Sequence, residues 1–366
     1  VRFSWRASGE ILSQACRRVY VALVRSCRRH QRILIKIPLG PDASGVRKSM
    51  MKPSDLVRLL STEAGAESCG DPSSPLVVDL DAGEIAGDIC QPACPVIGVA
   101  SRPIERPPMV LDLLVQPQDL DEVKAAVAAN PVAVSVLTGL LRHNERASVR
   151  GGLFAESLAY SSLQHGAEFE CWLETAPPSA GERDTGPLVL LEREDDRLTI
   201  TLNRPDKHNA FSADLRDALC EALHLPLTDA TIEQVVIDGA GRSFCAGGDL
   251  TEFGEARDSA VAHLTRMTRS AAWLMHRLRE RLTVDVHGAC IGAGIELPAY
   301  AGRIVARDDA FFQLPEVSMG LIPGAGGTVS VLARIGRLRC AFMAVTGRRV
   351  GAEQALRWGL VDEVRS

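Results

Sequence analysis

Three glycine-rich segments in the second half of the 366-residue chain carry the residues best suited to chemistry. They are SFCAGGDL at 243–250, VHGACIGAGIEL at 286–297 and LPEVSMGLIPGAGGT at 314–328. The second and third contain carboxylates, Glu296 and Glu316, in runs that are otherwise small or apolar. Glycine lets the backbone approach a ligand closely. Backbone amides beside two carboxylates predict proton transfer next to a carbonyl, with paired N–H groups holding the oxyanion that develops.

Purely structural roles for Glu296 and for the glycines are also compatible with the sequence. Glu296 could lie in a surface turn or pair with an arginine such as Arg303, because an unpaired carboxylate in an apolar site is costly unless it gains partners. The glycines at 324, 326 and 327 are typical turn formers. The chain contains no Walker loop, no dinucleotide-binding glycine motif and no G-x-S-x-G nucleophile motif. Phosphate cradling by a Walker loop is therefore excluded, and a dinucleotide site is not favoured.

Strands and helices that alternate after residue 187 must position these segments. LVLLERED and RLTITLNRP alternate as two strands of a hairpin, FSADLRDALCEALHL predicts a helix that Ser212 caps, and EQVVIDGAG predicts a buried strand. Further strands are expected in VDVHGAC and RIVAR, a helix near Gly292, and a final helix and strand in GAEQALRWGLVDEV. This alternation predicts an α/β fold with crossover helices.

A resemblance becomes specific when a fourth segment is added. NRPDKHNAF at 203–211 and the three glycine-rich segments resemble, in order and spacing, the signature segments of the enoyl-CoA hydratase/isomerase (crotonase) superfamily, over about residues 187–364. The resemblance implies a spiral of repeated ββα units. It also implies a coenzyme A thioester as part of the substrate, no separate cofactor or metal, and assembly into a homo-trimer or hexamer.

The resemblance assigns roles to individual residues. The amides of Gly248 and Ala293 would form the oxyanion hole, although the family usually has glycine at the second position, and Glu296 and Glu316 would hold and activate water. Contacts to coenzyme A are expected from the loops that contain Lys207, Ala210, Ala246, Gly247, Asp249, Leu250 and Gly292.

The leading functional prediction is therefore a 2-enoyl-CoA hydratase, because paired carboxylates favour hydration over isomerisation. An enoyl-CoA isomerase is one alternative. Another is a cofactor-independent aryl-acetyl-CoA dioxygenase, since residues 296–330 also resemble the dihydroxyphenylacetyl-CoA dioxygenase subgroup. A non-catalytic CoA-binding assembly subunit represents a different class of function.

The chain divides into four predicted parts. Residues 1–50 are basic and are expected to be disordered or to precede the true start of translation, and 51–117 are expected to form short strands and loops. Residues 118–186 predict a helical arm and a linker. Residues 187–366 form the crotonase-like domain, without the C-terminal helical segment usual in the family. Residues 150–172 of the arm are expected to pack near the thioester site.

Composition limits the partners. The formal net charge is -5, so no nucleic-acid partner is predicted. Residues 1–52 hold twelve Lys and Arg against Glu10 and Asp42, so an amphipathic targeting arm or a nucleic-acid arm is the alternative to a start assigned too far upstream. The ten cysteines are scattered, which predicts reduced thiols in a cytoplasmic protein without a metal site. No apolar stretch reaches the length of a membrane span.

Overall fold

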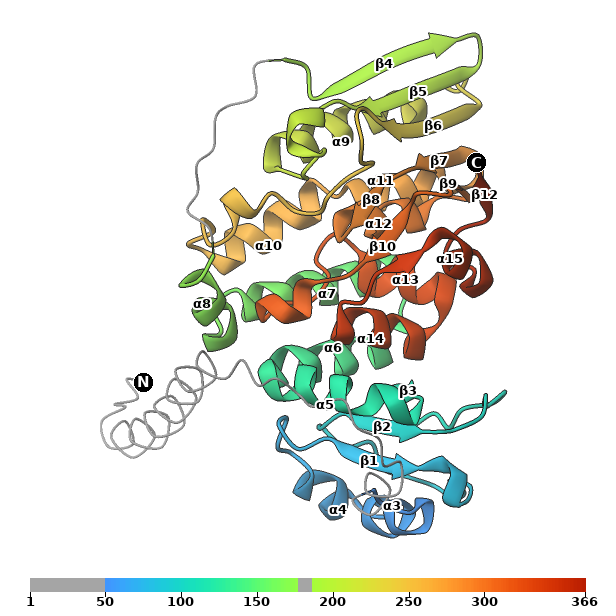
Figure 1. Ribbon diagram of the computed structural model, residues 1–366. Coiled ribbons are helices and arrows are strands. Elements are labelled where there is room, and N and C mark those ends of the chain that lie inside the picture. The colour runs from blue at the N-terminus through green and yellow to red at the C-terminus, as the bar shows by residue number, and fades with distance from the viewer. Residues whose placement is uncertain (1–49, 177–185) are drawn as a thin grey trace, which may run out of the picture.

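The computed structural model describes residues 50–176 and 186–366. The predictions for residues 1–49, and for the part of the linker at 177–185, lie outside these described residues. The described elements form an N-terminal unit, a group of helices and a larger α/β region, which follow one another from the bottom to the top of Figure 1.

A six-stranded sheet organises the α/β region. Its strand order is β12-β9-β7-β6-β5-β4, and only β4 runs antiparallel to its neighbour. The bounds are β4 (Val189–Glu194), β5 (Arg197–Leu202), β6 (Gln234–Gly239), β7 (Leu282–Val286), β9 (Arg303–Arg307) and β12 (Glu363–Arg365). The predicted hairpin and the predicted strands are confirmed, and parallel neighbours with intervening helices make this an α/β fold.

Helices connect these strands, and a second, small sheet lies beside them. The helices are α9 (Ala213–Thr228), α10 (Ser259–Thr268), α11 (Ala271–Leu278), α12 (Ala293–Glu296), α13 (Gly327–Ile335), α14 (Arg337–Thr346) and α15 (Ala352–Trp358). Ser212 caps α9 as predicted, because its side chain accepts a hydrogen bond from the Leu215 amide. The small sheet has the order β11-β10-β8, from β8 (Ala289–Ile291), β10 (Phe311–Gln313) and β11 (Val350–Gly351).

The N-terminal unit has more regular structure than the sequence predicts. Its parallel sheet runs β1-β2-β3, with β1 (Leu76–Asp79), β2 (Val96–Val99) and β3 (Leu113–Val115). The apolar runs LVVDLD at 76–81 and MVLDLLVQ at 109–116 predict β1 and β3, whereas β2 between them was missed. Helices α3 (Pro53–Leu60) and α4 (Glu63–Ser68) were also missed, although the α3 residues Leu56 and Leu60 are fully buried.

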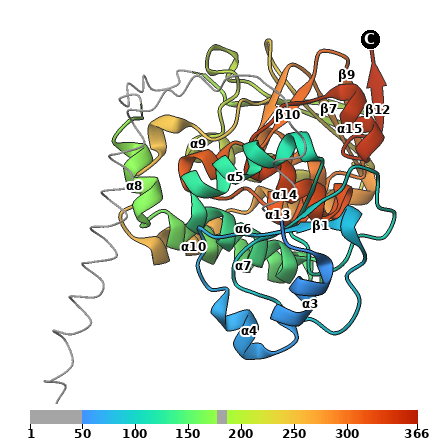
Figure 2. The same cartoon turned by 60° about the horizontal axis from the view of Figure 1, so that its bottom comes forward.

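Four helices follow this unit. They are α5 (Leu120–Ala129), α6 (Pro131–Asn144), α7 (Val149–Leu163) and α8 (Ala167–Leu173). The sequence shows one continuous helical pattern through 151–173. The backbone is instead extended at Gly166, and α8 begins at the next residue. Helix α7 packs against α6, α10 and α13, so the arm lies directly on the α/β region (Figures 1 and 2). Residues 150–172 therefore pack on the α/β region, while their position relative to a bound thioester stays a prediction.

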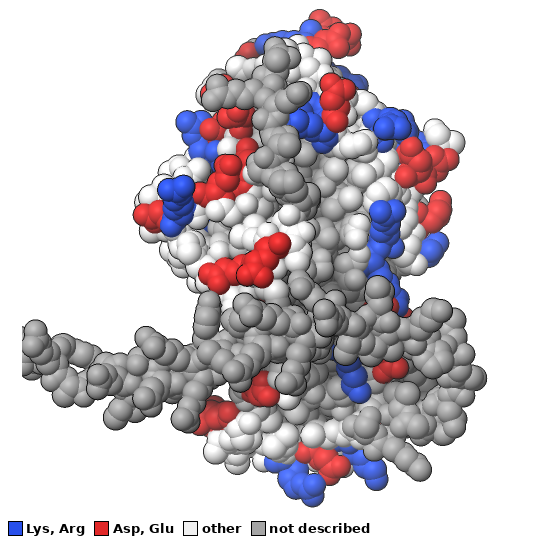
Figure 3. Space-filling view, turned by 60° about the vertical axis from the view of Figure 1, so that its left-hand side comes forward, with Lys and Arg blue, Asp and Glu red and all other residues white. Residues whose placement is uncertain are grey.

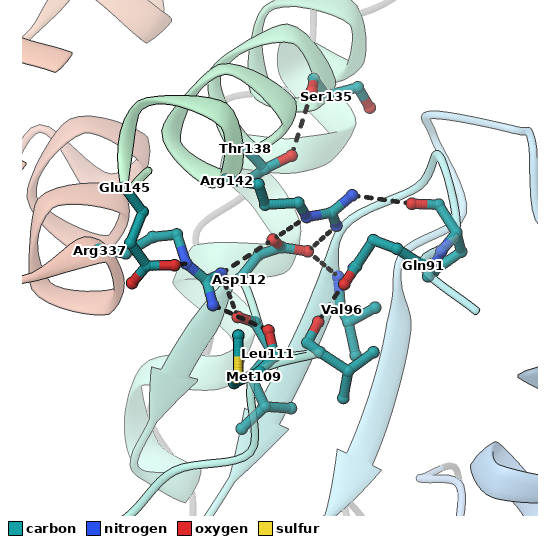
Figure 4. A network of polar contacts seen from close by, with 12 residues as sticks. Gln91, Val96, Met109, Leu111, Asp112, Ser135, Thr138, Arg142, Glu145 and Arg337 are labelled. Atoms are coloured by element: carbon teal, nitrogen blue, oxygen red, sulfur yellow. Dashed lines mark hydrogen bonds and ion pairs between the residues drawn. The ribbon is translucent and has the colours of Figure 1, made fainter. Parts of the chain in front are cut away.

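A buried ionic cluster joins the N-terminal unit to helix α6 and to helix α14. Asp112 accepts hydrogen bonds from Arg142 of α6, from Arg337 of α14 and from the Val96 amide of β2 (Figure 4). Arg337 also donates to Glu145 and to the carbonyls of Leu111 and Met109. Each charge thus has opposite charges or carbonyl dipoles around it, which is the condition for burying ions in a protein.

The described residues bear on predictions about surface charge, cysteines and membrane spans. Acidic and basic side chains are interspersed on the coloured part of the face in Figure 3. Among the described cysteines seven are free, but Cys171 is disulfide-bonded, so the prediction of reduced thiols throughout is wrong at this residue. Within the described ranges no single helix has the length and hydropathy to cross a bilayer, although the bent pair 117–129 and 131–144 would meet that test by length and composition.

Candidate active site

The segments 243–250 and 286–297 lie side by side at the centre of the site. Isolated β-bridges pair Cys245 with Cys290 and Phe211 with Gly248. Asn209 holds the neighbouring NRPDKHNAF loop in place, because its buried amide nitrogen donates to the carbonyls of Ala240, Ser243 and Phe244. The segment 243–250 is therefore fixed from both sides.

The amides predicted to form an oxyanion hole are available for a ligand. The neighbouring amides of Ala246, Asp249 and Gly292 donate to backbone carbonyls. In contrast, the N–H groups of Gly248 and Ala293 have no acceptor among the described residues. Ala293 is buried and Gly248 is half-buried on the wall of one cavity, so both amides can donate to a ligand acceptor placed there.

Glu296 is buried and is held by backbone amides. One carboxylate oxygen, Oε2, accepts from the Ala325 amide at 2.8 Å and from the Gly327 amide at 2.9 Å. Glu296 is 2% exposed. The alternatives of a surface turn and of a pair with Arg303 are wrong, since Arg303 pairs with Glu363 at the surface.

Glu316 approaches the same point from the other side. Its Oε1 lies 2.5 Å, and Glu296 Oε1 lies 3.7 Å, from the position that a Cβ atom on Gly292 would occupy. Gly292 has φ of +50°, which favours glycine, and the missing side chain leaves room for both carboxylates. Glu316 Oε2 is buried and has no hydrogen-bond partner in the described part of the chain.

A third carboxylate, which the sequence analysis missed, comes from helix α7. Glu156 accepts hydrogen bonds from the Gly326 amide at 2.7 Å, from the Thr328 amide at 3.0 Å and from the Thr328 hydroxyl at 2.6 Å. It is 2% exposed. The predicted turn-forming glycines are therefore also donors, because Gly326 and Gly327 each give an amide to a buried glutamate.

Burial without an ion pair raises the pKa of all three glutamates. Burial is the main cause in each case; it raises the pKa of Glu296 to about 7, and burial with the nearby charge of Glu296 raises the pKa of Glu156 to about 8. The pKa of Glu316 lies well above its usual range for the same two reasons. Carboxyls with such pKa values can exchange protons near neutral pH, as acid/base groups must.

These groups line one cavity of about 240 Å³. Gly248, Ala293, Glu296 and Glu316 lie on its wall with Glu156. The rest of the wall is partly apolar and partly cationic, and includes Tyr160, Phe211, Phe253, Met267 and the arginines at 216, 266 and 269. No group of His, Cys, Asp and Glu within residues 50–176 and 186–366 is arranged to hold a metal ion.

The loops predicted to contact coenzyme A meet beside this cavity. The Ala246 amide donates to the His208 carbonyl, and the Phe211 amide donates to the Gly247 carbonyl, so the stretches 207–211 and 246–250 lie together. Lys207 ends a 3-10 turn and Leu250 is exposed. Asp249 is buried and pairs with Arg204 at 2.7 Å, so its side chain braces the loop.

Comparisons with known proteins agree with the motifs. The family model for enoyl-CoA hydratase/isomerase matches residues 192–366. The 2,3-dehydroadipyl-CoA hydratase of Escherichia coli (strain K12) is 35% identical over 177 residues, which cover 48% of this chain and 68% of that protein. The chain belongs to the enoyl-CoA hydratase/isomerase family. Its relatives include hydratases and isomerases of acyl-CoA thioesters, as the motifs predict.

Other members of the enoyl-CoA hydratase/isomerase family show similar coverage. The 1,2-epoxyphenylacetyl-CoA isomerase of E. coli (strain K12) is 33% identical and matches 48% of this chain and 69% of its own length. The crystal structure of an enoyl-CoA hydratase from Mycobacterium smegmatis is 33% identical and matches 50% of this chain and 71% of that one, with a TM-score of 0.46. The chain spans about two thirds of the length of the curated relatives it matches.

Sequence reasoning missed the residues that the helical arm brings to the site. Glu156 and Tyr160 stand in LFAESLAYSSL, where they follow the helical period and look like any polar or aromatic helix residue. Arg266 lies in α10, a segment for which no motif suggested a role. The one useful signal was the prediction that this arm packs on the site, which makes every polar residue on its inner face a candidate.

Proposed function

We propose that this member of the enoyl-CoA hydratase/isomerase family is a 2-enoyl-CoA hydratase. The observation that carries the proposal is the meeting of two unpaired amides, at Gly248 and Ala293, with two buried glutamates around Gly292 in one cavity of the described structure. The amides suit a thioester oxygen, and paired carboxylates suit the two proton transfers that hydration requires.

The two glutamates differ in a way that assigns their roles. Glu296 accepts two amide N–H groups, which favour its charged form, so Glu296 is the base that removes a proton from water. Glu316 has a pKa well above its usual range and, within the described residues, an unpaired Oε2, so Glu316 is the acid that holds a proton until it is needed. Near neutral pH the pair can supply one acid and one base.

The reaction then follows from these positions. The water oxygen bonds to the β-carbon as Glu296 takes its proton, and the electrons of the C=C bond move onto the thioester as an enolate. The amides of Gly248 and Ala293 hold the enolate oxygen. Glu316 delivers its proton to the α-carbon, which gives a 3-hydroxyacyl thioester, and proton exchange with solvent restores both carboxyls.

Coenzyme A is proposed to lie along the paired loops outside the cavity. Support comes from the position of Lys207 to Ala210 beside Ala246 to Leu250, next to the Gly248 amide. The loop backbone is held rigidly by Asn209 and by the Arg204–Asp249 pair, so it is ordered before the ligand binds. Such preorganisation reduces the entropy lost on binding.

We also propose the spiral of ββα units and a homo-trimer or hexamer for the assembled protein. Support for assembly comes from four exposed apolar residues on the packed helices α7 and α10, namely Phe154, Leu158, Val261 and Leu264. Solvent-exposed apolar patches mark interaction sites on many proteins. Light scattering at several protein concentrations would test this assembly, and a monomer at all of them would refute it.

The hydratase proposal is tested with a panel of saturated and 2-enoyl-CoA thioesters in ¹⁸O-labelled water, with and without dioxygen, read by mass spectrometry. We expect one enoyl-CoA to gain one labelled water whether or not dioxygen is present. A product of unchanged mass with a shifted double bond would indicate an isomerase. Incorporation of unlabelled oxygen from the gas would indicate the dioxygenase, and an unreacted panel would contradict enzymatic turnover of these substrates.

A further inference from the structure

Four consecutive amides at the start of helix α13 are shared alternately by two glutamates. The amides of Ala325 and Gly327 donate to Glu296, and those of Gly326 and Thr328 donate to Glu156. One glutamate comes from α12 at the predicted reaction centre, and the other comes from α7 of the helical arm. Neither carboxylate can move without shifting a turn that the other one holds.

The geometry makes this turn dependent on both acceptors. Gly326 has φ of +106°, and the Tyr300 hydroxyl donates to its carbonyl from a third direction. The Thr328 hydroxyl donates to Glu156 and accepts from the Asn144 amide of α6. If Glu156 lost its acceptor atoms, two buried amides would lose their partner, and an unsatisfied buried donor destabilises the structure around it.

Charge links the same two glutamates. Six ionisable groups from the surrounding elements interact electrostatically with Glu156. They are Glu296, Glu316 of the turn Glu316–Met319, Tyr160 of α7, Arg266 of α10, Tyr300 of the turn Pro298–Tyr300 and Cys340 of α14. Burial raises the pKa of Tyr160, Tyr300 and Cys340, so they stay neutral at neutral pH. Arg266 donates its hydrogen bonds to Ser157 and Ser161, and it makes no ion pair with these glutamates in the described structure.

We propose that Glu156 is a positioning residue of the active site, which fixes the orientation of Glu296 through the shared turn and makes Glu316 harder to ionise. The inference rests on the proposed function, where Glu296 is the base and Glu316 the acid. It gives the helical arm a specific task, since the arm supplies the third carboxylate. Glu156 acts through Glu296 and needs no contact with the reacting atoms.

The test uses Glu156→Gln in the full chain. The glutamine oxygen can still accept the Gly326 amide, but the side chain carries no charge and cannot accept from the Thr328 amide. The charge of Glu156 raises the pKa of Glu316, so without that charge Glu316 should release its proton more easily. We expect the titration of Glu316, followed by ¹³C NMR of labelled glutamate side chains, to move to lower pH by about one unit or more, and the alkaline limb of the pH–rate profile of hydration to move in the same direction.

Glu168→Gln is the matched control. Glu168 belongs to the same arm, and its two oxygens accept the consecutive amides of Val132 and Ala133 at 2.8 and 2.9 Å. Its pKa is raised by burial and lowered only by those amides, so no buried carboxylate acts on it within the described residues. Glu168→Gln should therefore leave both the active-site titrations and the position of the pH–rate profile unchanged.

A second pair of variants keeps the test decisive if Glu156→Gln folds poorly. Glu156→Asp retains the charge with a shorter reach, so it should keep the titration but lower kcat, because the turn loses its hydrogen bonds. Glu296→Gln should shift the titration of Glu156 to lower pH, since coupling between two sites is reciprocal. Titrations that stay in place in both Glu156→Gln and Glu296→Gln would overturn the inference.

The outcomes separate this inference from the proposed function. A loss of kcat in Glu156→Gln that is equal at every pH, with unmoved carboxyl titrations, would show that Glu156 is structural only, while hydration by the wild-type protein would still support the hydratase. Shifted titrations in a protein that hydrates no enoyl-CoA would support the coupling and contradict the hydratase proposal.

Discussion

Two groups of buried carboxylates in this chain have opposite surroundings. Asp112, 1% exposed, lies between the guanidinium groups of Arg142 and Arg337. Glu156, Glu296 and Glu316 are also buried, and none forms an ion pair in the described structure. The hydrogen bonds that Glu156 and Glu296 accept at the turn 325–328 come only from amides and one hydroxyl. Burial alone therefore does not reveal the role of an acidic residue.

The difference lies in what balances the charge. Two arginines balance the charge of Asp112 and make it a joint between the N-terminal unit, α6 and α14. Amides stabilise a carboxylate less than a cation does, so the glutamates keep raised pKa values and can take up or release protons. Paired charges hold this fold together, while carboxyls without an ion pair are its proposed acid/base groups.

Asp112→Asn should have the largest effect, and on stability alone. Removing one member of a buried ionic cluster leaves uncompensated charges, here Arg142 and Arg337, and typically costs about 3 to 5 kcal/mol. Denaturant unfolding should show this loss. The folded variant should retain its kcat, and a large loss of kcat at full stability would contradict the division between the two groups.

Glu316→Gln should have the converse effect. We expect hydration to fall by at least about a hundredfold, the usual scale of general acid–base catalysis, with coenzyme A affinity nearly unchanged. Steady-state kinetics on the best enoyl-CoA and calorimetric titration with coenzyme A measure the two quantities. Retained activity would show that Glu316 is not a proton-transfer group.

Gly292→Ala should affect both properties moderately. The backbone of Gly292, with φ of 50° and ψ of -119°, costs a residue with a side chain about 1 to 3 kcal/mol, and the new methyl group would lie 2.5 Å from Glu316 Oε1. Pushing that carboxyl aside should lower kcat by about tenfold or more, because small misplacements of catalytic groups are costly. Gly351→Ala is the matched control, since no described atom lies within 4 Å of the added Cβ there and its φ is negative.

The pH dependence of stability should show the smallest effect. The pKa of Glu296 is raised from 4.5 to about 7 on folding, so the folded state binds this proton more tightly than the unfolded state does. Stability from this group is therefore present below pH 4.5 and is lost as the pH rises through 7. Thermal unfolding should give a Tm that falls by a few degrees over this window, and Glu296→Gln should flatten the curve. A Tm that rises across the window in the wild type but not in Glu296→Gln would contradict the assigned direction.

The sequence alone determined much of the α/β region. Alternating apolar residues predicted β4 and β5, and a serine before a helical pattern predicted the start of α9, because these signals depend on local periodicity and capping. The four ordered motifs predicted the family. They also identified Gly248, Ala293, Glu296 and Glu316, which the structure brings to one cavity.

Only the tertiary structure decided what surrounds these residues. Strand β2, in PVIGV, is short and fully buried, so it shows no alternation that a sequence could reveal. Glu156 is separated from Thr328 by 172 positions, and nothing in either segment marks the contact. Local patterns specify which element forms and which face it buries. The sharing of four amides between two glutamates arises from the packing of α7 on α13, a long-range contact that depends on the whole fold.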